Sequence, residues 1–219
     1  MDFSFLKKTI LFHNLKDQEL KEAFSYLKTR VASFEKKETI FHAGFPTSEL
    51  GVVLSGSVHI ENYDLWGNRT ILGHVEPGGI FAESYALFPK EAMMVDVIAN
   101  EPAKILFIDI YNFISKEYPA YSSYRKIYQN LLIATSRKNL ELSSRIFHTS
   151  SKTIRGRISS YLSGQSIRCH STEFSIPFNR QQLADYLSVD RSALSKELGK
   201  MREEELIRFR KNHFEIIEL

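Results

Sequence analysis

Apolar positions form their clearest pattern near the C-terminus, where two helical stripes follow each other closely. The first stripe begins after Asn179, a residue type that favours helix N-caps, and Gln182 stands where it can complete a capping box. The second stripe follows Asp190, which is also a favoured N-cap residue. The apolar residues of the two stripes are Leu183, Ala184 and Leu187, and then Leu194, Leu198 and Met201. This pattern predicts two short helices that are joined by a tight turn at residues 187–189.

The second of these helices also carries a polar face that has cations and small hydroxyl groups and no carboxylate. At about 100° per residue this face lies apart from the apolar stripe, and it consists of Arg191, Ser192, Ser195 and Lys196. Arginine can donate two hydrogen bonds to guanine, lysine can reach guanine or phosphate, and serine adapts to either. Downstream, residues 207–210 and 214–216 alternate as two strands, and Lys211 and Asn212 suit the turn between them. This order is that of a winged helix-turn-helix, which reads DNA with its second helix; an ordinary amphipathic helix pair is the alternative.

The N-terminal half has a different pattern, in which a helical lead is followed by short strands. Residues 3–27 show helical spacing that is interrupted at His13 and Asn14. Short alternating segments bounded by glycine and proline then predict strands at residues 39–42, 51–54, 58–63, 70–75, 93–98 and 104–109. Several short strands at this spacing indicate a small barrel or a double-sheet roll.

A long helical pattern connects the two halves, from Pro119 to about His148. One apolar face has the three- and four-residue spacing of paired helices and consists of Tyr124, Tyr128, Leu131 and Thr135. A second apolar face contains Ile127, Leu132 and Ile133. Because a helix that is apolar on two sides must bury both, we expect one face against the strands and the other against a second copy of the chain. A helix that faces a single core is the alternative.

We therefore predict an α+β chain of three parts. Residues 1–118 form a double-stranded β-roll of the cupin-like jelly-roll type, residues 119–150 form the long dimerisation helix, and residues 151–219 form the winged helix-turn-helix. The last part is expected to start with a helix at residues 152–163 that ends in the segment 163–166.

Composition narrows the classes of function. The chain has 219 residues, of which 43% are hydrophobic and 25% charged, and its net charge of +3 is mild. It has one cysteine, Cys169, no apolar run of membrane-spanning length and no signal-peptide pattern, so we expect a cytoplasmic protein. Basic residues concentrate between Arg137 and Arg168, where we expect DNA phosphates to approach. Since no serine, histidine and aspartate set forms a catalytic motif, the chain is not predicted to be an enzyme.

Two segments resemble the Crp–Fnr family of bacterial transcription regulators. The run RQQLADYLSVDRSALSKEL, residues 180–198, resembles the DNA-binding signature of the family. Residues 41–44 and 52–58 resemble the β-roll that the family shares with cyclic-nucleotide-binding domains. Ser188 stands where the family often has glycine, and Ser192 stands where many members have a glutamate that reads a base, so the half-site sequence stays open.

The resemblance implies a homodimeric, effector-responsive regulator that binds a roughly palindromic site on double-stranded DNA and works with RNA polymerase. The residues expected at the DNA are Arg180, Gln181, Arg191, Ser192, Ser195, Lys196 and Lys211. The alternative is a module that senses a nucleotide or another small molecule and does not bind DNA. The sequence leaves open the effector, the operator, the target genes and the sign of regulation.

The ligand site is where the chain departs from the family. Nucleotide-binding members have a Gly-Glu-Leu stretch and a later arginine, in which the glutamate holds the ribose and the arginine neutralises the phosphate. Here Ala82 replaces the glycine, Glu83 is kept, and the arginine position falls at Met93 or Met94. Because a buried phosphate without a cation is costly, cyclic AMP is not the expected effector. We expect an adaptable apolar pocket instead, formed by Phe81, Glu83, Ser84, Tyr85, Met93 and Met94.

One alternative interpretation of this site stays open. The same positions can form a plain hydrophobic core, in which case Glu83 would cap the short helix that follows. Cofactors and metal ions are not expected, because an iron–sulfur cluster needs about four cysteines and a lone His74 in a strand is a poor indication of haem.

Overall fold

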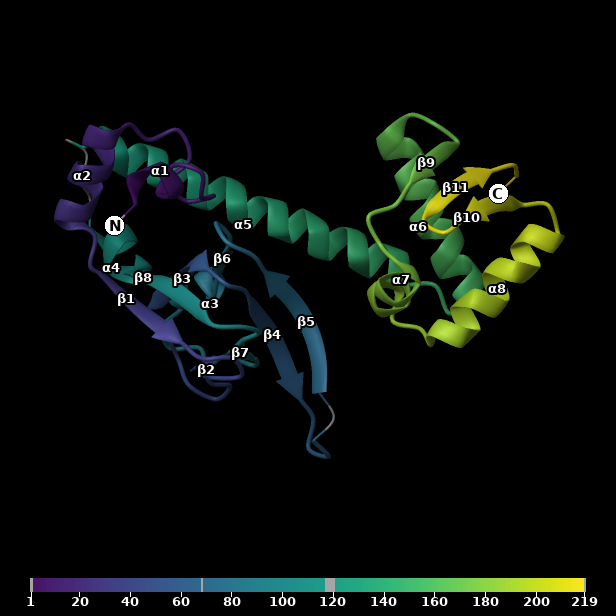
Figure 1. Ribbon diagram of the computed structural model, residues 1–219, viewed down its shortest axis with the longest axis horizontal. Helices are drawn as coiled ribbons and strands as arrows, with labels where there is room; N and C mark the ends of the chain where they lie inside the picture. Colours follow the sequence, from purple (N-terminus) through teal and green to yellow (C-terminus); the bar gives the residue numbers. More distant parts are fainter. Residues whose placement is uncertain (1, 68, 117–120, 219) are drawn as a thin grey trace. The chain divides into compact units, whose positions relative to one another are not determined.

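The computed structural model describes residues 2–67, 69–116 and 121–218, and the chain divides into two units, Met1–Arg137 and Lys138–Leu219 (Figure 1). The first unit holds the β-roll, its flanking helices and the first part of the long helix. The second unit holds the rest of that helix and the winged helix-turn-helix. The predicted α+β class is confirmed. The predicted boundary at residues 118–119, with Pro119, lies outside the described residues.

Two antiparallel sheets of four strands each form the β-roll. The first sheet has the order β1 (Thr29–Phe34), β8 (Ala103–Asp109), β3 (Glu49–Ser55) and β6 (Ile80–Phe81). The second has the order β2 (Thr39–Phe41), β7 (Asp96–Ala99), β4 (Val58–Tyr63) and β5 (Arg69–Val75). Four short helices accompany them: α1 (Phe3–Leu6), α2 (Asp17–Tyr26), α3 (Glu83–Leu87) and α4 (Ile110–Ser115).

All six predicted strands are present, and two others were not predicted. Strand β1 pairs along its whole length with β8, yet it carries Arg30 and shows little apolar alternation. Strand β6 has only two residues. Strand β7 begins later than predicted, because Met93 bonds through its backbone to Gly44 and Phe45 in the loop after β2 and not to a strand.

Strand β8 is buried on both faces, which explains its uninterrupted apolar sequence. Ile105 and Phe107 lie in the core between the two sheets. Leu106 and Ile108 alternate with them and lie in a second core, to which α2 and the long helix contribute. The first sheet therefore separates the interior of the roll from the helices that cover its other face.

The long helix α5 (Ser122–Thr149) has two apolar faces, as predicted, but the residues divide between them differently. Leu131 is only 3% exposed and lies in the same core as Ile127, because the four-residue step keeps both on one side of the helix. The prediction that Leu131 lies on the free face is therefore wrong. The exposed apolar face of α5 consists of Tyr128, Leu132, Ile133, Leu140, Leu142, Ile146 and Phe147.

Two other predicted interface residues are only partly exposed. The ring of Tyr124 packs beside Phe113, with the ring centroids 4.9 Å apart, and it contributes to the core of the first unit. The Thr135 hydroxyl donates to the backbone carbonyls of Leu131 and Leu132, both at 3.0 Å. Of the four residues predicted for the dimer interface, Tyr128 is thus the most open to a partner.

Helix α6 (Ile154–Cys169) is longer than predicted, because it continues through Gly164 until His170 adopts a left-handed conformation. Gly164 lies against the buried ring of His148, and a Cβ atom there would lie 2.8 Å from His148 Cε1. This glycine therefore permits close helix packing and does not end the helix. None of the described helices is both long and apolar enough to cross a membrane.

The winged helix-turn-helix consists of α7 (Arg180–Leu187), α8 (Arg191–Glu203) and a sheet of order β10 (Ile207–Arg210), β11 (His213–Ile216) and β9 (Glu173–Ser175). The predicted capping box is present: Asn179 Oδ1 accepts from Gln182 N at 3.0 Å, and Gln182 Oε1 accepts from Asn179 N at 2.8 Å. Asp190 caps α8 by accepting from Ala193 N at 2.9 Å. Ser188 ends α7 with φ +53°, a left-handed geometry that glycine adopts most easily.

Candidate functional site

Helix α8 presents the predicted polar face to solvent. Arg191, Ser192, Ser195 and Lys196 are exposed, whereas Leu194, Leu198 and Met201 are fully buried on the opposite side. Within the described part of the chain, Arg191 and Lys196 make no hydrogen bond or ion pair. Their cationic groups are therefore available to an external acceptor.

Ser192 has a local partner as well as an exposed position. Its hydroxyl donates to Asp190 Oδ1, and this hydrogen bond, with that from Ala193 N, lowers the pKa of the Asp190 carboxyl. The cap stays ionised at the start of α8, where a negative charge is favourable. The Ser192 oxygen keeps its lone pairs and can still accept a hydrogen bond from a base.

Three arginines of the basic segment 137–168 hold the two helices in place. Arg155 donates to Glu197 at 2.6 Å and to both oxygens of Glu204 at 2.6 and 2.8 Å, which fixes α6 to α8. Arg157 donates to the carbonyl oxygens of residues 187 and 188, and Arg145 to those of residues 185 and 186. The last four carbonyls of α7 and its turn are thereby satisfied. We expected DNA phosphates to approach this basic segment, but these three arginines are already bonded to groups of the protein.

Arg180 joins the start of α7 to the wing, the hairpin of β10 and β11. Its guanidinium lies 5.1 Å from the centre of the Phe209 ring, and Nη2 donates to the carbonyl of Lys211 at 3.4 Å. Burial lowers the pKa of Arg180, but arginine stays charged. Lys211 is exposed at the turn with φ +57°, and exposed Gln181 donates to Asp185 at 2.8 Å. A groove of about 520 Å³ lies between the start of α7 and the wing. It is lined by Pro177, Phe178, Asn179, Arg180, Gln182, Lys211 and Asn212.

The interior of the β-roll is packed where an effector pocket was predicted. Phe81 and Met93 belong to the core between the sheets, and a side chain at Gly51 would collide with the Phe81 ring. Phe81 also contacts Phe41 edge to face, with the ring centroids 5.9 Å apart. At Phe81 and Met93 the structure therefore agrees with the alternative interpretation, a plain hydrophobic core.

The remaining predicted effector residues do not gather in one pocket, because some are buried and others are exposed. Met94 is 75% exposed, so the prediction that both methionines line one pocket is wrong: the chain bends between them, and Asn62 and Tyr85 bind the Met94 backbone. Ser84 is exposed and Tyr85 is partly buried. Glu83 is buried as the first residue of α3. Ala82 and not Glu83 is the N-cap of α3, and its φ of +61° lies in the left-handed region that favours glycine, the residue expected here from the resemblance.

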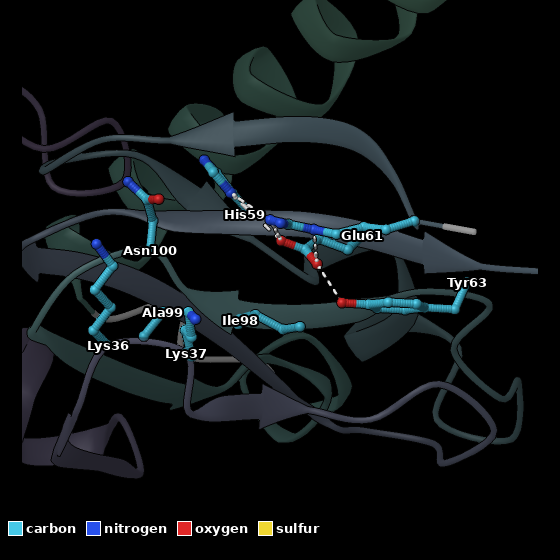
Figure 2. A pocket seen from close by; sticks show the side chains of 9 residues that line it. Lys36, Lys37, His59, Glu61, Tyr63, Ile98, Ala99 and Asn100 are labelled. Atoms are coloured by element: carbon cyan, nitrogen blue, oxygen red, sulfur yellow. Dashed lines mark hydrogen bonds and ion pairs between the residues drawn. The ribbon is translucent and has the colours of Figure 1, made fainter. Parts of the chain in front are cut away.

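A second hollow, which was not predicted from the sequence, lies on the outer face of the second sheet (Figure 2). It measures about 370 Å³ and is lined by Lys36, Lys37, His59, Glu61, Tyr63, Arg69, Ile98, Ala99 and Asn100. His59, Glu61 and Tyr63 alternate along β4, so their side chains share one face of the strand. In the sequence, this hollow is indicated only by the alternation of these three residues together with Arg69 after the predicted turn.

The hollow is organised around a buried carboxylate. Glu61 is 1% exposed and accepts from Arg69 Nε at 2.6 Å and from the Tyr63 hydroxyl at 3.0 Å. Burial would raise the pKa of Glu61, but the hydrogen bonds from Arg69 and Tyr63 outweigh it and lower the pKa. Burial, the neighbouring His74 and Arg69 lower the pKa of His59, which leaves it neutral near pH 7.

Two family models match the chain. One, described as a cyclic nucleotide-binding domain, matches residues 31–115, and the other, described as a Crp-like helix-turn-helix domain, matches residues 156–219. No curated protein sequence gives a significant match.

Solved structures share the fold along most of the chain. The catabolite activator protein of Thermus thermophilus is 24% identical with a TM-score of 0.50, and the match covers 96% of this chain and 94% of that one. The c-di-GMP-responsive global regulator CLP of Xanthomonas campestris is 16% identical with a TM-score of 0.57, over 93% of this chain and 100% of that one. FixK2 of Bradyrhizobium japonicum is 17% identical with a TM-score of 0.50, over 88% and 94%. With the two family models spanning well over half of its residues, the chain belongs to the Crp–Fnr family of DNA-binding transcription regulators.

Proposed function

We propose that this protein is a homodimeric, effector-controlled transcription regulator, and not an enzyme, that recognises a roughly palindromic DNA site with α8. The observation that carries the proposal is the exposed face of α8, where Arg191 and Lys196 have no partner among the described residues. Aligning an unpartnered arginine or lysine side chain with base edges and phosphates costs little free energy, because no internal interaction has to be broken. We further propose that it acts in the bacterial cytoplasm together with RNA polymerase.

In this proposal the two cations on the polar face of α8, Arg191 and Lys196, have different tasks. Arg191, in the first turn of α8, contacts guanine O6 and N7, and Lys196 reaches a guanine or a phosphate one turn later. Ser192 and Ser195 make the adaptable contacts between them. The wing and the start of α7 bind the DNA backbone, because Arg180 and Lys211 line one groove.

The exposed apolar face of α5 supports pairing with a second copy. Its residues repeat at intervals of seven, as in Ile133, Leu140 and Phe147, which is the spacing of two helices packed along their length. Large exposed apolar patches mark interaction sites. A two-fold axis between the helices would place two copies of α8 on two half-sites, which is why the proposed site is palindromic.

We propose that cyclic AMP is not the effector. By the resemblance, the position of the phosphate-neutralising arginine falls at Met93 or Met94, and the segment 91–103 has no lysine or arginine. Burying an unpaired phosphate anion costs several kcal/mol. Calorimetry on ligand-free protein should therefore show no micromolar binding of cyclic AMP that depends on Glu83. Micromolar binding that disappears in Glu83→Ala would show that the β-roll interior accepts this nucleotide without its arginine.

Selection of double-stranded DNA from a random pool tests the main proposal. The purified full chain should enrich one motif in two inverted copies, with their centres about 10 base pairs or a multiple apart, since that is one turn of DNA. The enriched site should then shift in a gel at low protein concentration, and a scrambled site should not. If no motif is enriched at low salt, the chain is the small-molecule-sensing module of the alternative.

A further inference from the structure

We propose that the hollow on the outer face of the second sheet binds a small organic phosphate monoester, at a site separate from the β-roll interior. The two places lie on opposite faces of β4: Val58 and Ile60 point into the core, whereas His59, Glu61 and Tyr63 line the hollow (Figure 2). A ligand here would not compete for the position that Glu83 occupies. The proposal is also independent of DNA binding.

The one carboxylate of the hollow is already satisfied. Arg69 and Tyr63 hydrogen-bond to Glu61, and His59 Nδ1 lies 3.5 Å from Glu61 Oε1. The carboxylate therefore serves to anchor Arg69, whose side chain is still about half exposed and whose Nη2 lies 3.3 Å from His59 Nδ1. An anion entering the hollow would meet the outer edge of a guanidinium that is held in place, which reduces the entropy lost on binding.

Lys36 and Lys37 supply two further cations on a fixed backbone. Lys37 N donates to Ala99 O at 2.7 Å, and Ala99 N donates to Glu38 O at 2.9 Å, so the turn between β1 and β2 is fastened to the end of β7. The two ammonium groups are exposed and make no ion pair with any residue that the structure describes. Asn100, held by its hydrogen bond to Ser57 Oγ at 3.1 Å, adds an amide at the same edge.

The balance of charge and shape indicates the class of ligand. Lys36, Lys37 and Arg69 outnumber Glu61 by two positive charges, which matches a phosphate monoester, with a charge of about −1.5 to −2 at neutral pH. A phosphodiester carries only one charge and matches less well. The side chain of Ile98 and the ring of Tyr63 give the hollow an apolar part, and its volume lies within the range of small-molecule sites.

Titration calorimetry with 5′-AMP and inorganic phosphate tests the proposal on the full chain. Both should bind, 5′-AMP more tightly, and adenosine should not, because it lacks the phosphate. The variant Lys36→Gln/Lys37→Asn should weaken 5′-AMP binding by about tenfold or more, as expected for loss of hydrogen bonds to a charged group. Asparagine is chosen at position 37 because it tolerates the φ of +70° found there.

Two controls make the result decisive. Lys21→Gln removes an exposed lysine of α2 and should leave 5′-AMP binding unchanged, and the melting temperature of the double variant should match the parent. The proposal is overturned if neither 5′-AMP nor phosphate binds at millimolar concentration, if adenosine binds as well as 5′-AMP, or if the double variant binds with unchanged affinity. None of these results would bear on DNA recognition by α8, which the selection experiment measures separately.

Discussion

Replacing Leu140 with glutamate should convert this protein into a monomer and weaken its binding to a two-half-site operator by about 10²–10⁴-fold. Leu140 is 69% exposed at the middle of the seven-residue repeat formed with Ile133 and Phe147. Across a two-fold axis the variant would place two carboxylates in an apolar seam, where each loses hydration without gaining a partner. The loss of affinity follows because the second half-site would no longer be bound at high effective concentration.

Analytical ultracentrifugation measures the first effect, and titration of the selected operator measures the second. Gln18→Glu is the matched control, because it adds one carboxylate to an exposed position of α2 and not of α5. Leu131→Glu is a second comparison, since burying a charge in the core of the first unit should unfold that unit and not merely separate subunits. A folded Leu140→Glu dimer would show that the subunits meet on another surface.

The DNA-binding half was predictable because its signals are local. Asn179, Gln182 and Asp190 act within three residues along the chain, so their hydrogen bonds follow from sequence alone. The exposed face of α8 follows from helical periodicity in the same way. What sequence did not reveal is that Arg145, Arg155 and Arg157 are used internally, because their partners lie about 30 to 50 positions further along the chain.

The assignment of faces on α5 shows a different limit. Periodicity shows that a helix has two apolar sides, but it does not show which side meets the β-roll. Leu131 and Leu132 are neighbours in sequence, and one is buried while the other is exposed. The distinction depends on how the helix is rotated against Leu20 and Ile108, a property of the assembled core and not of the helix sequence.

The ligand sites were the hardest to predict from sequence. Met93 and Met94 could not be separated, because an irregular turn and not a strand determines where each side chain points. The outer hollow combines a turn near residue 36, strand β4, strand β5 and the end of β7. Four of its residues, His59, Glu61, Tyr63 and Arg69, lie within one hairpin, so only these four had a sequence signal.

Replacing Arg191 with alanine should weaken specific DNA binding by about 1–3 kcal/mol and relax the sequence preference at one position of each half-site. The residue lies in the first turn of α8 on the exposed side, and no described residue bonds to its guanidinium, so the substitution should not change the melting temperature. The expected cost is that of a bidentate contact to guanine, which no other side chain near the start of α8 can replace.

Lys211→Ala provides the contrast that separates base recognition from backbone attraction. Lys211 is exposed at the wing turn, where we expect it to contact a phosphate. Loss of that contact should weaken binding to all sequences alike, and it should reduce the slope of log K against log salt concentration by about one. Repeating the random-pool selection with each variant measures the difference. Arg191→Ala should enrich a degenerate motif, because the cation that distinguishes guanine is gone, whereas Lys211→Ala should enrich the parent motif at lower yield. An unchanged motif and affinity for Arg191→Ala would mean that α8 does not read the bases through this residue, and that the polar face of α8 is only solvated.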